Sequence, residues 1–159
     1  MAPNALEFRV VCPELERPLA QFFCDLSSAG DTRQFHPHEF TDAEAHRRSC
    51  YVGNDLYYVA IAGGRILAYG MLRGWDEGFT VPSLGIALHP VSRGTGLART
   101  FMHFLHSAAM LRGAPKVRLK VYPDNVKAVH LYESLGYAFE AQEAGQLVGF
   151  LVLNESAPG

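Results

Sequence analysis

Residues 83–98 read SLGIALHPVSRGTGLA, and this stretch decides the fold that the chain is expected to adopt. Its first six residues alternate bulky Leu84, Ile86 and Leu88 with small side chains, the two-residue period of a strand with one nearly bare side. A turn that contains two glycines follows, and a helical pattern begins near residue 96. The backbone amides of this turn are therefore expected to gather at a helix N-terminus, where unpaired N–H groups attract anions.

The pattern continues into a helix over residues 96–112 and a strand over residues 116–122. The helix is predicted because six apolar residues fall on one face: Leu97, Phe101, Phe104, Leu105, Ala108 and Leu111. Gly113 and Pro115 end the helix. A strand, a crossover helix and a second strand predict a parallel pair with a right-handed crossover.

Strands are also expected on both sides of this unit. Residues 56–62 and 65–72 are β-rich and are joined by Gly63-Gly64, which suits a two-residue hairpin. The N-terminal part predicts a strand over 8–11, a helix that Pro13 opens and Gly30 ends, and a helix over 42–49 capped by Thr41. After residue 122 the pattern predicts a helix to about 134, capped by Asp124 or Asn125, and strands over 137–140 and 147–153. Gly136 stands where a left-handed residue ends that helix, and residues 154–159 are expected to form a frayed tail.

These elements predict an α/β protein with a mixed central sheet, a parallel β-α-β unit and helices on both faces, in a single domain over residues 1–159. Apolar residues make up 48% of the chain, which suits a packed core. Fourteen Lys and Arg stand against sixteen Asp and Glu, so nucleic acid and anionic membrane are not expected as partners. The three scattered cysteines and the N-terminal sequence favour the cytoplasm over export. His103 and His106 lack a third ligand, so no metal is expected.

The turn itself is a candidate phosphate-binding loop. Gly94, Gly96 and small Ala98 allow a phosphate to approach the main chain, and Arg93 adds a charged donor. A dinucleotide fingerprint would need glycine where Arg99 stands, and no Gly-Lys-Ser/Thr ending marks a nucleoside-triphosphate loop. Taken alone, the loop is equally compatible with a plain turn between a strand and a helix.

A second motif lies in residues 125–137, which read NVKAVHLYESLGY. Asn125 and Tyr132 are seven residues apart, so they lie within ~20° of each other on a helix surface and one ligand can meet both. A helix cap and a core tyrosine would explain the same two residues separately.

Taken in order, the bare-sided strand, the loop over 93–98, the long helix, the parallel strand and the 125–137 block resemble the GNAT superfamily of acetyl-CoA-dependent N-acetyltransferases. The resemblance covers about residues 80–140. It implies acetyl-CoA as cosubstrate and transfer of an acetyl group to a primary amine by direct attack in a ternary complex.

The resemblance also implies roles for individual residues. Ile86, Ala87 and Leu88 would offer backbone groups to the pantetheine arm, and the Leu88 amide would meet the developing oxyanion. The pyrophosphate would lie on the loop formed by Arg93, Gly94, Thr95, Gly96, Leu97, Ala98 and Arg99. Asn125 would contact the arm further along, and Tyr132 would donate a proton to the departing sulfur. A phenol with an ordinary pKa of ~10 stays protonated at neutral pH, which suits that role.

The amine must lose a proton before it attacks. At the positions where relatives carry the general base, this sequence has other residues. Some relatives place a glutamate or histidine early on the strand before the loop, where this chain has Pro82, Ser83 and Leu84. Others place a glutamate on the following strand, where this chain has Lys120. Glu77, Asp76, His36 and His38 could serve as the base directly or through water, and Glu77 is taken as the candidate catalytic residue. The candidate acceptor-binding residues are His36, His38, Trp75, Asp76 and Ser83.

The expected acceptor is a small-molecule amine. The stretches around His36 and Trp75 are similar to members that act on amino sugars, although aromatic and acidic side chains would equally suit an amino acid or a polyamine. Three alternatives stay open: a protein or peptide N-acetyltransferase with an open groove, a non-catalytic acetyl-CoA-binding module, and a plain nucleotide-binding domain. Assembly as a homodimer also stays open.

Overall fold

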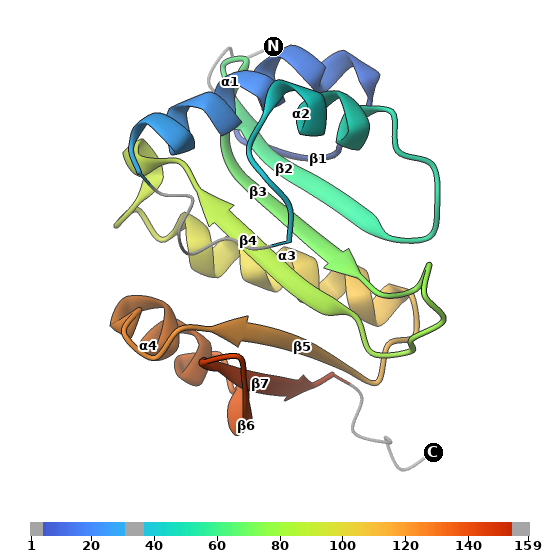
Figure 1. Cartoon of the computed structure of the whole chain (residues 1–159), viewed down its shortest axis with the longest axis vertical. Helices are drawn as coiled ribbons and strands as arrows, with labels where there is room; N and C mark the ends of the chain where they lie inside the picture. The colour runs from blue at the N-terminus through green and yellow to red at the C-terminus, as the bar shows by residue number, and fades with distance from the viewer. Residues whose placement is uncertain (1–4, 31–36, 154–159) are drawn as a thin grey trace.

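The computed structural model describes residues 5–30 and 37–153, which contain a seven-stranded sheet in the order β1-β2-β3-β4-β5-β7-β6 (Figure 1). The strands are β1 (Glu7–Val10), β2 (Leu56–Ala62), β3 (Arg65–Arg73), β4 (Ser83–Leu88), β5 (Lys116–Val121), β6 (Ala138–Glu143) and β7 (Gln146–Val152). The helices are α1 (Glu16–Ser28), α2 (Asp42–Ser49), α3 (Leu97–Leu111) and α4 (Val126–Ser134), with short 3-10 turns η1 (Pro13–Leu15) and η3 (Pro90–Ser92).

Two apolar clusters hold helices against the two faces of the sheet. On one face, Phe22 and Phe23 of α1 pack against Tyr69 of β3. On the other, buried Phe101 of α3 and Tyr132 of α4 belong to a cluster that includes the β5 core residues. Successive strand residues point to opposite faces, so β2 and β3 contribute buried side chains to both clusters.

The strands β4 and β5 form the parallel pair, and they meet at one end only. Within the described residues their register consists of Ser83 opposite Arg118, and the Arg118 N–H donates to the Pro82 carbonyl at 3.0 Å. Beyond this pair the strands diverge (Figure 1). All other neighbouring strands are antiparallel.

The fold class predicted from the sequence is confirmed, and most elements lie within two residues of their predicted bounds. Thr41 caps α2 through a hydrogen bond from the Glu44 N–H at 3.1 Å. The helix expected from Pro13 instead begins as the turn η1 and becomes α-helical at Glu16. Strand β6 extends to Glu143, beyond the predicted end at residue 140, because pairing with β7 continues through polar residues that carry no apolar alternation. The expected tail over 154–159 lies outside the described residues.

Candidate active site

The first of two adjoining cavities lies where β4 and β5 diverge, and we call it the loop cavity. Its volume is about 740 Å³. The lining comes from β4, the loop after it, the end of β5 and helix α4, and includes Leu84, Gly85, Ile86, Ala87, Leu88, Arg93, Gly94, Ala98, Lys120, Asn125 and Tyr132. The predicted phosphate loop and the 125–137 motif therefore share one cavity.

The free backbone of β4 faces this cavity. The His89 N–H donates to the Leu67 carbonyl of the preceding strand pair at 2.8 Å. Hydrogen-bonded and non-bonded pairs alternate along an antiparallel ladder, so the backbone groups of Ile86 and Leu88 point away from β3 and toward the opening. The backbone groups of Ala87 face β3 instead, and Ala87 contributes its small side chain.

The loop itself is shaped by two glycines with left-handed backbone. Gly94 has φ 74° and Gly96, the residue before α3, has φ 86°, a conformation that residues with a Cβ rarely adopt. Together they turn the chain from β4 into α3, so that the amides at the start of α3 belong to the loop. Exposed Arg93 reaches back to the Leu88 carbonyl at 3.4 Å.

A buried histidine anchors the loop to the opposite face of the sheet. The His89 ring accepts the Val91 N–H at Nδ1 (3.2 Å) and faces the Asp25 carboxylate of α1 at Nε2 (2.9 Å). The Nε2 nitrogen therefore carries the proton and donates to Asp25. Ser92 adds hydrogen bonds to the Leu67 and His89 carbonyls, both at 2.9 Å. These contacts hold the backbone from β4 to Arg93 in place before any ligand binds.

Tyr132 brings a phenol to the loop cavity. Its side chain is nearly buried, and among the described residues its hydroxyl has no hydrogen-bond partner. Burial raises the pKa of Tyr132 to about 12, so the phenol remains protonated across the neutral range. A protonated, unpaired hydroxyl in a cavity is suited to donate a proton to a leaving group.

Asn125 stands at the N-cap of α4 and lines the same cavity. Its side chain makes no capping hydrogen bond, so the plain capping role does not explain it. Asn125 and Tyr132 thus line one cavity, as their seven-residue separation predicts.

The second cavity, which we call the strand cavity, has a volume of about 670 Å³. It shares Pro37, Leu84, Gly85 and Lys120 with the loop cavity, so the two spaces meet at the middle of the sheet. Ser83 and Glu77 line it, together with Arg73, Phe79, Lys116, Arg118 and Phe150. Gly85 keeps the junction open, because a Cβ there would come within 3.2 Å of Met71 Cγ and 3.4 Å of Pro37 Cγ.

Some predicted coenzyme-binding residues lie beside the loop cavity without lining it. Leu97 is buried in the core, and the Arg99 guanidinium donates to Ser134 Oγ at 2.8 Å. The Thr95 hydroxyl donates to the Ser92 carbonyl and so closes the loop on itself. Their backbone amides stay candidates for the pyrophosphate, and their side chains serve the loop's own structure.

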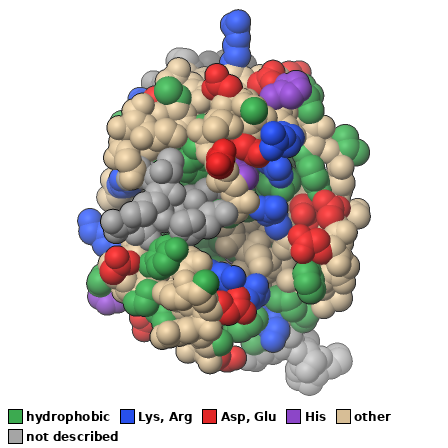
Figure 2. All heavy atoms as spheres, in the orientation of Figure 1, with side chains coloured by type: hydrophobic (Ala, Val, Ile, Leu, Met, Phe, Trp, Pro, Cys, Tyr) green, Lys and Arg blue, Asp and Glu red, His purple; other side chains and the backbone are tan. Residues whose placement is uncertain are grey.

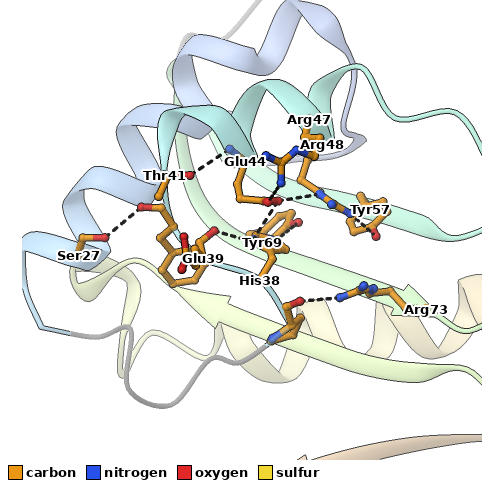
Figure 3. Close-up of polar contacts among 12 residues, drawn as sticks. Ser27, His38, Glu39, Thr41, Glu44, Arg47, Arg48, Tyr57, Tyr69 and Arg73 are labelled. Atoms are coloured by element: carbon orange, nitrogen blue, oxygen red, sulfur yellow. Dashed lines mark hydrogen bonds and ion pairs between the residues drawn. The ribbon is translucent and has the colours of Figure 1, made fainter.

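Several predicted acceptor-binding residues have structural partners elsewhere. The His38 ring is packed under α2, with Nε2 at 2.8 Å from the Tyr69 hydroxyl (Figure 3). The Asp76 carboxylate accepts hydrogen bonds from the Tyr51 hydroxyl and the Asn54 N–H. Trp75 lies under the guanidinium of Arg112, the residue that follows α3. None of these three is among the residues that line either cavity, and His36 lies outside the described residues.

Sequence reasoning missed the basic side chains of the strand cavity. Lys116, Arg118 and Lys120 alternate along β5 and all line this cavity. Their two-residue spacing could have indicated that the three side chains share one face of a strand. In the sequence, Lys120 was noted only as a departure from the family pattern. The matching Arg73 comes from β3, and only the folded sheet brings it to the same space.

A metal centre has no visible ligand set within residues 5–30 and 37–153, where no three His, Cys, Asp or Glu side chains cluster. The expectation that the protein uses no metal stays a prediction. Across the same ranges, every helix is too short or too polar to cross a membrane.

Comparison with known proteins points to one family. Residues 20–137 match the model of the acetyltransferase (GNAT) family. An acetyltransferase of Sodalis glossinidius is 33% identical over 95 residues, which are 60% of this chain and 64% of that relative, so the match spans less than two thirds of the relative's length. A GCN5-related N-acetyltransferase from Kribbella flavida superposes with a TM-score of 0.76 at 23% identity, covering 96% of this chain and all of the other. An acetyltransferase structure from Salmonella typhimurium, solved with acetyl-CoA, superposes with a TM-score of 0.75 at 17% identity and covers 97% of each chain.

Proposed function

The chain belongs to the acetyltransferase (GNAT) family, and we propose that it transfers an acetyl group from acetyl-CoA to the primary amine of a small molecule. Transfer occurs by direct attack of the amine in a ternary complex, without a covalent enzyme intermediate. A cytoplasmic location and function as a single domain belong to the same proposal, and a homodimer stays open.

The observation that carries this proposal is the junction of the two cavities at Leu84 and Gly85. Acetyl-CoA in the loop cavity would supply the thioester at this junction. An amine in the strand cavity would reach it from the adjoining space. Two ligands can therefore meet without either leaving its own site, as a ternary complex requires.

The residues of the loop cavity fit this cosubstrate. Loop amides and Arg93 suit a pyrophosphate, and the outward backbone groups of Ile86 and Leu88 suit the amide-rich pantetheine arm. The Leu88 N–H is the candidate donor for negative charge that develops on the acetyl oxygen. Tyr132 would protonate the departing sulfur, whose ordinary thiol pKa of ~8.5 lies well below that of the phenol.

Glu77 is the candidate group that takes the proton from the amine. It lies on the wall of the strand cavity and is exposed, so it can act directly or through water. A lysine-like amine costs roughly 4–5 kcal/mol to neutralise at pH 7, whereas an α-amine costs only about 1–1.4 kcal/mol. A base is accordingly more important for the first kind of acceptor.

Two measurements test the proposal. Acetyl-CoA should raise the melting temperature and ATP should not, because only a ligand of the native state shifts the unfolding equilibrium. A thiol-release assay over amino sugars, amino acids, polyamines and peptides should then show turnover on small amines. No thermal shift at saturating acetyl-CoA would end the proposal, and turnover on peptides alone would favour a protein or peptide N-acetyltransferase.

A further inference from the structure

We infer that the strand cavity binds an oxyanion of the acceptor, a carboxylate or a phosphate, through a row formed by Arg73, Ser83 and Arg118. We call these three residues the anion row. The inference rests on the proposed function, since it assigns the acceptor class for that same site. It predicts an acceptor that carries a primary amine at one end and an anionic group several bonds away.

The anion row crosses three adjacent strands in register. Arg73 of β3 lies opposite Ser83 of β4, and Ser83 lies opposite Arg118 of β5. Side chains of directly paired residues project from the same face of a sheet, and in an antiparallel pair such as Arg73 and Ser83 the Cβ atoms are roughly 4.5–5.5 Å apart. All three residues line the strand cavity, so two guanidinium groups flank one hydroxyl on a single wall.

The charge of the cavity also favours an anion. Its lining contains four cations, Arg73, Lys116, Arg118 and Lys120, against one carboxylate, that of Glu77. Outside the lining, Glu143 of β6 contacts both Arg118 and Lys120 at 2.8 Å and compensates one charge of the two. Figure 2 shows Lys and Arg side chains gathered at the hollow in the middle of this face.

Arg73 and Lys116 have no carboxylate partner within the part of the chain that the structure describes. The Arg73 guanidinium donates to the Pro37 carbonyl at 2.9 Å (Figure 3), and the Lys116 ammonium lies 4.7 Å from the centre of the Phe150 ring. These contacts orient both cations without neutralising them. A guanidinium next to a hydroxyl offers several donors in a planar arrangement that matches carboxylate and phosphate oxygens.

The position of the anion row sets the distance to the reacting amine. Ser83 precedes Gly85, at the junction of the cavities, by two residues, which is about 7 Å along a strand. The acceptor is therefore expected to separate its amine and its anion by roughly that length. Polyamines and other purely cationic amines would meet an excess of like charge.

The test compares acceptors that differ only in their far end. Acetyl transfer is measured with glycine, β-alanine, 4-aminobutyrate and 6-aminohexanoate, each against the amino alcohol and the diamine of equal chain length. The same assay with 2-aminoethyl phosphate, compared with the amino acids, distinguishes recognition of a phosphate from recognition of a carboxylate. We expect at least a tenfold higher kcat/KM for an acid than for its matched alcohol and diamine, with the optimum at intermediate length.

Variants connect this preference to the anion row. Arg73→Gln and Arg118→Gln should each reduce the acid-to-alcohol preference severalfold through KM, and Arg73→Lys should retain part of it. Arg17→Gln is the matched control, because Arg17 is exposed and lines neither cavity. Unchanged melting temperature and acetyl-CoA affinity show that each variant is folded.

A binding arm keeps the test independent of turnover. Calorimetry measures 4-acetamidobutyrate and its uncharged carboxamide on the enzyme saturated with coenzyme A. Tighter binding of the acid without transfer to any amine would retain the oxyanion site and reject the proposed function. The inference would be overturned by equal kcat/KM for acids and their matched alcohols, by equal binding of the acid and the carboxamide, or by anion-row variants that behave like Arg17→Gln. Each of these outcomes would leave the acetyltransferase proposal intact.

Discussion

Ser83 of β4 lies directly opposite Arg118 of β5, and this pair holds the two parallel strands together at the end where the strand cavity begins. Past the pair, the strands separate and the loop cavity opens between them. The pair thus belongs to the proposed acceptor site, and the junction with the proposed coenzyme site follows directly along β4, at Leu84 and Gly85.

Replacement of Tyr132 by phenylalanine should lower kcat by roughly 10²-fold, because the departing sulfur loses its proton donor. The affinity for acetyl-CoA should be nearly unchanged, since the ring remains in place. Stopped-flow thiol release and calorimetry measure the two quantities. Tyr137→Phe is the matched control: the Tyr137 hydroxyl lies 2.7 Å from His106 Nε2, so its loss should cost about 1 kcal/mol of stability with little effect on kcat. A Tyr132→Phe enzyme with wild-type kcat, in a chemistry-limited assay, would exclude the proposed role.

Substitutions at Gly85 should obstruct the junction between the cavities. A Cβ at this position meets Met71 and Pro37 at 3.2 and 3.4 Å, and the flexible methionine can yield to one methyl group. We therefore expect a modest loss of kcat/KM for Gly85→Ala and a loss on the order of 10² for Gly85→Val, which displaces the reacting groups. Acetyl-CoA affinity, measured separately, distinguishes a blocked acceptor from a blocked coenzyme. Wild-type kcat/KM in both variants would show that the two ligands do not meet at Gly85.

The Asp25 to His89 hydrogen bond should contribute to coenzyme affinity from a distance, because it holds the loop in the bound shape. Losing one such bond costs roughly 0.5–1.5 kcal/mol. Asp25→Ala is accordingly expected to raise the Kd for acetyl-CoA by about 2–10-fold. Gln21→Ala serves as control, since it removes the other side-chain contact of Asp25 and leaves His89 bound. Equal Kd values for the two variants would exclude a contribution of the Asp25–His89 hydrogen bond to acetyl-CoA affinity.

Acid should destabilise the protein through His106. Burial, with a smaller contribution from nearby His103, lowers the pKa of His106 to about 4, below its usual value of 6.5. The folded state therefore favours the neutral ring, so the stabilisation is complete above about pH 6.5 and is lost as the pH falls toward 4. The loss amounts to about 3 kcal/mol.

Urea unfolding between pH 7 and 4 measures this effect in wild type and in His106→Gln. The variant can keep a hydrogen bond to Tyr137 but cannot take up the proton, so its stability should fall less over the same range. The pKa of His38 is also lowered by burial and acts with the same sign, which is why the difference between the two proteins is the informative quantity. Parallel pH profiles would contradict the assignment to His106.

The order of the elements was predictable because it is recorded in local patterns. The alternation over 83–88, the helical face over 96–112 and the glycines of the loop each follow from contacts between near neighbours in the chain. The coenzyme side of the site was predictable for the same reason, since Arg93, Asn125 and Tyr132 belong to two short continuous motifs. Family resemblance then added their roles.

The acceptor side could not be predicted in this way, because its residues come from different strands and turns. His38, Trp75 and Asp76 looked available as polar or aromatic residues in irregular segments, yet each is held by a partner distant in sequence: Tyr69, Arg112 and Tyr51. Conversely, Lys116, Arg118 and Lys120 were predicted only as part of a strand, and they line a cavity in the folded protein.

The sequence by itself determined the elements, their order and the coenzyme loop, because these depend on backbone preferences and side-chain periods within a few residues. Only the tertiary structure decided where β4 and β5 part, which side chains share a cavity and what charge that cavity carries. Arg73 and Arg118 are 45 residues apart in the chain, and cross-strand pairing brings them to the two sides of Ser83. The order of the strands in the sheet sets that proximity, and this order depends on contacts between segments that are distant in the chain.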